Sequence, residues 1–181
     1  MTNNNLIMKT KSIFTGKVKF VLATFIFTLL LILREYYSGG VITHYLLARE
    51  DLPGFSNWWG LLTVSLLAIV TLSINSRERK GKIFEINDSQ FLRRLLGGFV
   101  FGVIISLLWE FDLEHILRYF ILLPIVIAIF KPVHFLEYLL GFVLGMLFSF
   151  GGVLPNIIGT VLLIACFVVN KLVQIIKNLI V

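Results

Sequence analysis

Six long apolar segments, separated by short polar stretches, leave this chain few possible folds. Hydrophobic residues make up 58% of the 181 residues and charged residues only 14%, against the roughly 25% of an ordinary soluble domain. Apolar segments of this length cross a bilayer as helices, because every backbone polar group must be satisfied inside the hydrocarbon. We therefore predict an all-α, polytopic membrane helix bundle with six transmembrane helices, over residues 18–33, 57–76, 91–109, 113–130, 135–150 and 154–176.

The stretches between the apolar segments indicate a single domain. No Pro-, Ser- or Gln-rich linker divides the sequence, so we predict one integral membrane domain over residues 1–181. The GGVLPN sequence at 151–156 breaks the last apolar stretch into two helices. The first apolar segment follows a basic stretch but is not followed by a small-residue cleavage site, so we expect it to be a retained helix.

Charged residues are distributed unevenly between the two sides that six alternating helices define. One side receives 13 of the 16 Lys and Arg residues, whereas the other receives six of the ten Asp and Glu residues. The positive-inside rule then places both termini in the cytoplasm. We expect an integral protein of a bacterial inner (plasma) membrane. The lipid bilayer is its main partner, and anionic headgroups account for the basic loop at 77–94 without a nucleic-acid partner.

Two GxxxG motifs predict close helix packing. Gly98 and Gly102 lie on one helix face, and Gly141 and Gly145 lie on another. Small residues at this spacing let two helix backbones approach closely in lipid. We favour the interior of the bundle as their place, with a homo-oligomer formed through the same faces, or a membrane partner subunit, as the alternatives.

The first outer loop is the polar segment with the richest chemistry. It reads REYYSGGVITHYLLAREDLPGFSNWWG over residues 34–60, and VITHYLLA within it predicts a short interfacial helix. The second outer loop, WEFDLEHILR, spaces Glu110, Glu114 and Arg118 along one helix face. Because all four flanking helices emerge on the same side, we expect the two loops to meet.

A ligand site formed by these loops would grip a carboxylate or phosphate with arginine and use tryptophan as stacking walls. Its candidate residues are Arg34, Glu35, His44, Arg49, Glu50, Asn57, Trp58, Trp59, Glu110, Glu114 and Arg118.

A divalent metal such as zinc is a further candidate for the outer face. His44, Asp112 and His115 would hold it, and a metal-bound water would attack an ester or amide of a lipid. The opposing interpretation is that Glu114 pairs with Arg118 and that the aromatic residues form the usual interface belt. On the cytoplasmic side, we expect His134 and Glu137 to reach the interface or to pair with Lys131.

Three functions follow from these patterns. The first is binding or transport of a small polar or lipid-headgroup ligand at a polar site of His, Arg and carboxylate on the outer face. The alternative is a membrane-embedded hydrolase or transferase that uses a metal or an acid–base pair on a lipid-like substrate. The second alternative is a non-catalytic subunit of a membrane complex. The sequence assigns no catalytic residue and leaves open whether the protein is an enzyme.

Overall fold

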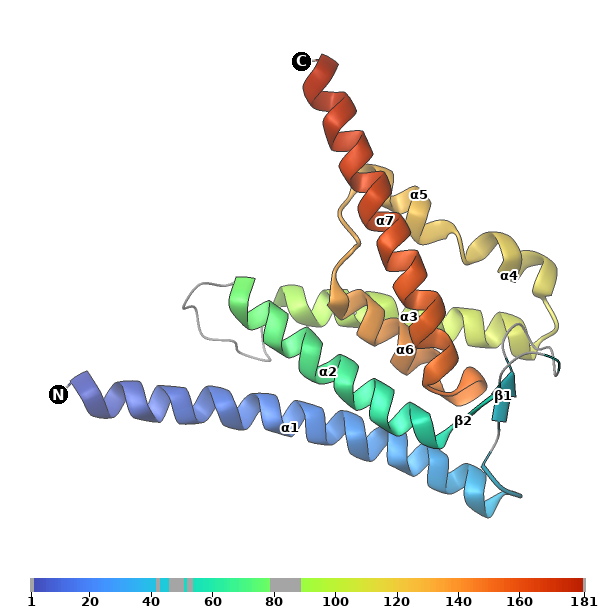
Figure 1. Cartoon of the computed structure of the whole chain (residues 1–181), viewed down its shortest axis with the longest axis horizontal. Coiled ribbons are helices and arrows are strands. Elements are labelled where there is room, and N and C mark those ends of the chain that lie inside the picture. The colour runs from blue at the N-terminus through green and yellow to red at the C-terminus, as the bar shows by residue number, and fades with distance from the viewer. Residues whose placement is uncertain (1, 42, 46–50, 52–53, 79–88, 181) are drawn as a thin grey trace.

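The computed structural model describes residues 2–41, 43–45, 51, 54–78 and 89–180. Figure 1 shows a helical molecule with one small two-stranded sheet. In chain order the elements are α1 (Thr2–Tyr37), β1 (Thr43–Tyr45), β2 (Gly54–Ser56), α2 (Trp58–Glu78), α3 (Ser89–Glu110), α4 (Glu114–Phe120), α5 (Leu123–Phe130), α6 (Leu136–Phe150) and α7 (Val153–Ile180).

Four of these helices are long and apolar enough to cross a membrane. The spans are Gly16–Tyr37, Trp58–Asn75, Ser89–Glu110 and Val153–Leu179. Helix α6 is apolar but shorter. The prediction of an all-helical integral membrane protein is thus confirmed, whereas six crossings and their sidedness stay predictions.

The helix predicted over residues 113–130 is wrong as a single element. The chain forms two short helices, α4 and α5, joined at Ile121 and Leu122. Pro124 lies in the first turn of α5, where its missing N–H costs nothing. Within a continuous helix the same proline would remove a hydrogen bond to the preceding turn, so the chain turns before it.

The interfacial helix predicted in the first outer loop is also wrong where the structure describes it. Thr43, His44 and Tyr45 form strand β1, which pairs antiparallel with β2 in the register Thr43↔Ser56 and Tyr45↔Gly54. Gly39 and Gly40 precede the strand with φ of 134° and 120°, a conformation that glycine adopts without strain. The chain therefore reverses directly after α1 into an extended segment.

The core of the molecule lies where α1, α2, α3 and α6 run alongside one another (Figure 1). Its fully buried side chains include Val64 and Ala68 from α2, Ile105 from α3, and Leu140 and Val143 from α6. Helices α3 and α6 form the most extensive interface. They run parallel, since Gly98 lies against Tyr138 while Gly102, one turn later, lies against Phe142.

The two GxxxG motifs pack against each other within the chain. A Cβ at Gly98 or Gly102 would overlap a carbonyl oxygen of α6, and a Cβ at Gly141 or Gly145 would overlap a carbonyl oxygen of α3. The predicted place in the bundle interior is confirmed. An oligomer through the same faces would have to displace this pairing, and it stays a prediction.

Helices α4, α5 and α7 form a second group that diverges from the first. Helix α7 crosses the other long helices steeply, and α5 packs along it (Figure 1). The short turn between α6 and α7 joins the two groups at the predicted outer end. They therefore enclose an angle, with α3 and α6 on one side and α5 and α7 on the other.

Candidate functional site

At the predicted outer end of the bundle, a buried asparagine ties three elements together. Asn57, which immediately precedes α2 and is 5% exposed, donates through Nδ2 to Glu35 Oε1 of α1 at 2.6 Å. Its Oδ1 accepts from the backbone N–H of Gly152, in the turn between α6 and α7, at 3.3 Å. Two residues of the predicted site, Glu35 and Asn57, are thereby brought together in a structural contact.

Three other predicted residues of the α1–α2 region are Arg34, Trp58 and Trp59. The Arg34 guanidinium lies over the Phe148 ring, 4.8 Å from its centroid. Trp58 and Trp59 are 49% and 61% exposed, as expected for residues of an interfacial belt.

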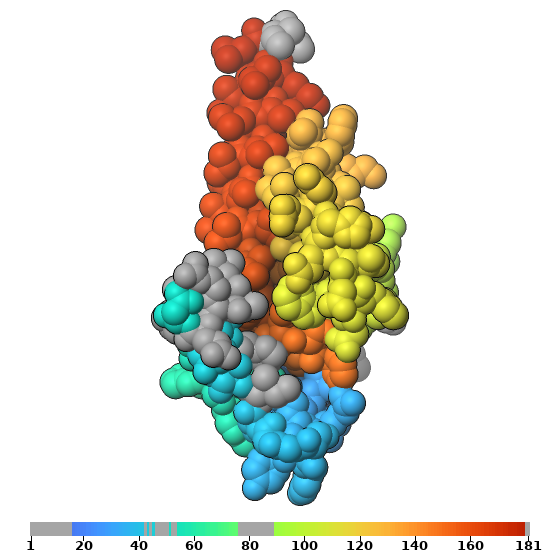
Figure 2. All heavy atoms as spheres, turned by 90° about the vertical axis from the view of Figure 1, so that its right-hand side faces the viewer, coloured from blue at the N-terminus to red at the C-terminus, as the bar shows by residue number. Residues whose placement is uncertain are grey.

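The charged residues of the second outer loop lie elsewhere on the outer face. In Figure 2 the orange turn between α6 and α7 lies between the blue end of α1 and the yellow α4. The predicted site residues of this second outer loop are all exposed: Glu110, Asp112, Glu114, His115 and Arg118.

The metal prediction rests partly on residues that the structure does not describe. Only the backbone of His44 is described, in β1 opposite Phe55. Arg49 and Glu50, which belong to the ligand prediction, also lie outside the described residues. Within the described part of the chain, no three His, Cys, Asp or Glu side chains gather closely enough to hold a metal ion.

A second polar cluster, at the opposite end of α2, was missed by sequence reasoning. Asn75 Nδ2 donates to Glu137 Oε1 at 2.5 Å, and Arg94 Nη1 lies 3.6 Å from the same oxygen. Glu137 is 5% exposed, and the Arg94 guanidinium also covers the Phe135 ring at 3.6 Å. The expected pairing of Glu137 with Lys131 is wrong, because the start of α6 turns this carboxylate toward α2 and α3.

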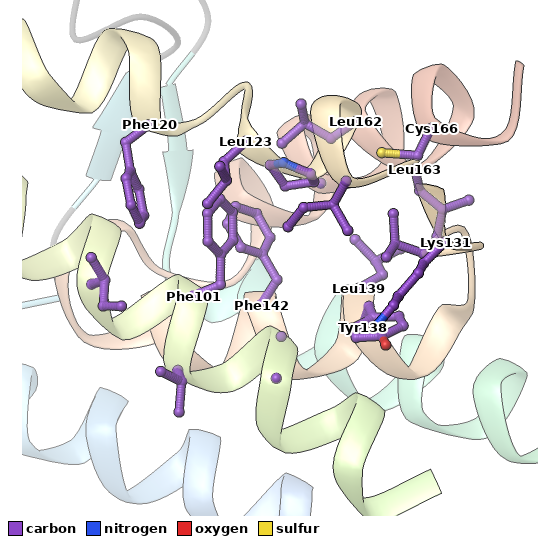
Figure 3. A pocket seen from close by; sticks show the side chains of 18 residues that line it. Phe101, Phe120, Leu123, Lys131, Tyr138, Leu139, Phe142, Leu162, Leu163 and Cys166 are labelled. Atoms are coloured by element: carbon purple, nitrogen blue, oxygen red, sulfur yellow. The ribbon is translucent and has the colours of Figure 1, made fainter. Parts of the chain in front are cut away.

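A cavity between the two helix groups has room for a ligand. It has a volume of about 400 Å³, within the range of small-molecule sites. Figure 3 shows side chains of α3, α5, α6 and α7 converging on it. Its lining residues include Phe101, Ile104, Leu123, Ile127, Tyr138, Leu139, Phe142, Leu162, Leu163 and Cys166.

The cavity wall is almost entirely apolar. Phe101 stacks on Phe120 with ring centroids 5.4 Å apart and lies 5.8 Å from Phe142, so aromatic rings brace one end. Val100, Leu123 and Ile127 line it while remaining more than a third exposed, on a surface that would face lipid in a membrane. The cavity is therefore open on this side. It suits an alkyl or isoprenoid chain, which gains free energy from close contact with apolar walls.

Lys131 and Tyr138 supply polar atoms at one end of this cavity. Lys131 follows the last residue of α5, and Tyr138 lies in the first turn of α6. Both residues line the cavity, and in Figure 3 they lie on the side opposite Phe120. In the sequence, only Pro124 and the Lys131–Pro132 pair indicate that a short helix, α5, begins and ends here.

No family model matches the chain, and neither a curated protein nor a solved structure matches it.

Proposed function

We propose that the protein binds the apolar part of a lipid-like ligand in the cavity between α3, α6, α5 and α7. The observation that carries this proposal is the cavity itself, about 400 Å³ in volume with an almost wholly apolar wall. The proposal keeps the ligand-binding class predicted from the sequence. It moves the main binding surface from the outer loops to the membrane-embedded part of the chain.

The position of the opening supports a ligand that arrives from the bilayer. Val100 is 54% exposed and lines the cavity, so its side chain stands where an alkyl chain would enter. Binding in such a place exchanges contacts with lipid for contacts with a fixed wall. Selectivity would then come from shape and from polar groups at the rim.

Photo-crosslinking in nanodiscs of phosphatidylcholine tests this proposal. The probe is a set of hexadecyl compounds with one diazirine at mid-chain and different headgroups. Mass spectrometry should find labelled residues concentrated on the cavity-lining stretches of α3, α5 and α7. A tryptophan at position 100 would fill the entrance, so Val100→Trp should lower this labelling about tenfold, as expected for the loss of roughly 1.4 kcal/mol of binding.

Val161→Trp is the matched control. Val161 is 62% exposed on α7 and does not line the cavity, so its replacement should leave the labelling unchanged. Labelling spread evenly over all lipid-facing residues, with no effect of Val100→Trp, would contradict the proposal.

A further inference from the structure

The polar end of the cavity contains a cation, Lys131. Among the residues that the structure describes, Lys131 has no ion-pair partner. Arg94, by contrast, already lies against Glu137 and the Phe135 ring. Lys131 is exposed, so its ammonium lies at the mouth of the cavity and is available to an anion there.

The two ends of the cavity differ in a way that would orient a ligand. Lys131 and the Tyr138 hydroxyl lie at one end, and the stacked pair of Phe101 and Phe120 lies at the other (Figure 3). An ammonium and a phenol are both hydrogen-bond donors, a combination that suits a carboxylate or a phosphate. A chain running toward the phenylalanines would place an acidic headgroup between these two donors.

The volume limits the ligand to a slender molecule. About 400 Å³ is near the lower limit for ligand pockets, which favours one alkyl chain over two.

The contacts of Glu137 with Asn75 and Arg94 place the start of α6 level with the end of α2 and the start of α3. By the distribution of basic residues, this is the predicted cytoplasmic end of the bundle.

We infer that the cavity is selective for a single-chain amphiphile with an anionic headgroup, held by Lys131 and Tyr138 while its chain lies along Phe101 and Phe142. The inference rests on the proposed function and adds the chemical class and the orientation of the ligand. A fatty acid and an alkyl or isoprenyl phosphate share this chemistry.

Four diazirine probes with the same hexadecyl chain test the inference in the same phosphatidylcholine nanodiscs. Their headgroups are a carboxylate, a phosphate, a hydroxyl and a trimethylammonium. We expect the phosphate or the carboxylate to label the cavity about tenfold more strongly than the alcohol, the size of effect that a charge-assisted hydrogen bond gives. The stronger of these two probes identifies the headgroup.

Variants of Lys131 then assign the selectivity to its charge. Lys131→Gln should remove the preference for the anionic probes and leave labelling by the alcohol unchanged, while Lys131→Arg should keep the preference. Lys171→Gln is the matched control, because Lys171 lies on α7 over the Phe167 ring and does not line the cavity.

The possible failures are distinguishable. Equal labelling of the cavity by all four probes, unaffected by Lys131→Gln, would overturn the headgroup inference and leave the proposed function standing. Stronger labelling by the trimethylammonium probe would overturn it as well. If none of the four probes labels the cavity of the folded protein, both the headgroup inference and the proposed function would be overturned.

Discussion

Helix α6 has two sides that are built in different ways. Toward α3 it presents Gly141 and Gly145, and the two backbones touch. Toward α5 and α7 it presents Tyr138, Leu139 and Phe142, and these bulky side chains border an open volume. The same helix thus belongs to a closed interface and to a cavity. The tight packing of α6 against α3 fixes the α6 backbone in place. Because this backbone cannot move to fill the cavity, the cavity on its other side stays open.

We expect a large loss of stability when the buried Glu137 carboxylate at the start of α6 is removed. Replacing Glu137 with alanine leaves the Arg94 guanidinium and the Asn75 amide facing an apolar space. We expect a loss of about 3 kcal/mol in the free energy of unfolding, because the buried Asn75 amide loses a charged acceptor and Arg94, whose side chain is 26% exposed, loses its counter-ion. SDS titration of the protein in mixed micelles measures it.

Two further variants separate the charge from the hydrogen bond. Glu137→Gln keeps an oxygen for Asn75 and should lose less than Glu137→Ala. The double variant Glu137→Ala with Arg94→Leu removes the unpaired cation and should recover part of the stability. A double variant no more stable than Glu137→Ala would show that the ion pair does not hold this end of the bundle together.

Two leucines provide a direct comparison of the closed and open sides. Leu140 is 0% exposed in the core, whereas Leu162 lines the cavity on α7. Leu140→Ala should cost about 2–5 kcal/mol, because a new void opens among packed side chains. Leu162→Ala should cost less than about 1 kcal/mol, since that side chain already borders empty volume and loses fewer contacts. Equal losses in the same titration would mean that the cavity wall is as tightly packed as the core.

Adjacent glycines on α3 sharpen the comparison within one turn of helix. A Cβ at Gly98 would overlap the carbonyl oxygen of Tyr138, which is backbone and cannot move aside. A Cβ at Gly97 would lie 3.3 Å from Cε1 of the Tyr138 ring, a side chain that can adjust. Gly98→Ala should therefore destabilise by about 1–3 kcal/mol, as overpacking does. Gly97→Ala should be close to neutral or gain up to about 1 kcal/mol from helix propensity. Thermal melting followed by tryptophan fluorescence distinguishes them.

The closed side was predictable from the sequence because its signal is local. Apolar length identified the long helices, and the GxxxG spacing marked the glycines that meet inside the bundle. Glu35 and Asn57 were identified as outer-face polar residues, although the sequence did not show that they bond to each other. The partners of Glu137 lie 62 and 43 positions away, at Asn75 and Arg94, and no pattern of spacing connects such distant residues.

The open side was not predictable because it depends on how whole helices tilt. Its shape follows from the break before Pro124 and from the steep crossing of α7 (Figure 1). Both depend on packing rather than on hydrophobic periodicity. The short strand β1 was missed for a related reason, since pairing with β2 outweighed the weak helical pattern of VITHYLLA.

A substitution of the phenylalanine that braces the cavity tests most directly whether packing limits binding. Phe101 stacks on Phe120 and contacts Phe142, so Phe101→Leu should cost about 0.5–1.5 kcal/mol in lost aromatic contact. The same change enlarges the cavity, and labelling by the preferred hexadecyl probe should stay equal or rise. Phe150→Leu is the control, because Phe150 contacts the Trp109 ring at 5.3 Å and does not line the cavity. It should lose similar stability with no change in labelling. If Phe101→Leu instead lowers labelling while Phe150→Leu does not at a similar loss of stability, then Phe101 supports the ligand directly and the open volume does not limit binding. A variant that loses stability while keeping or gaining ligand would show that the space between the two helix groups is maintained at some cost to folding.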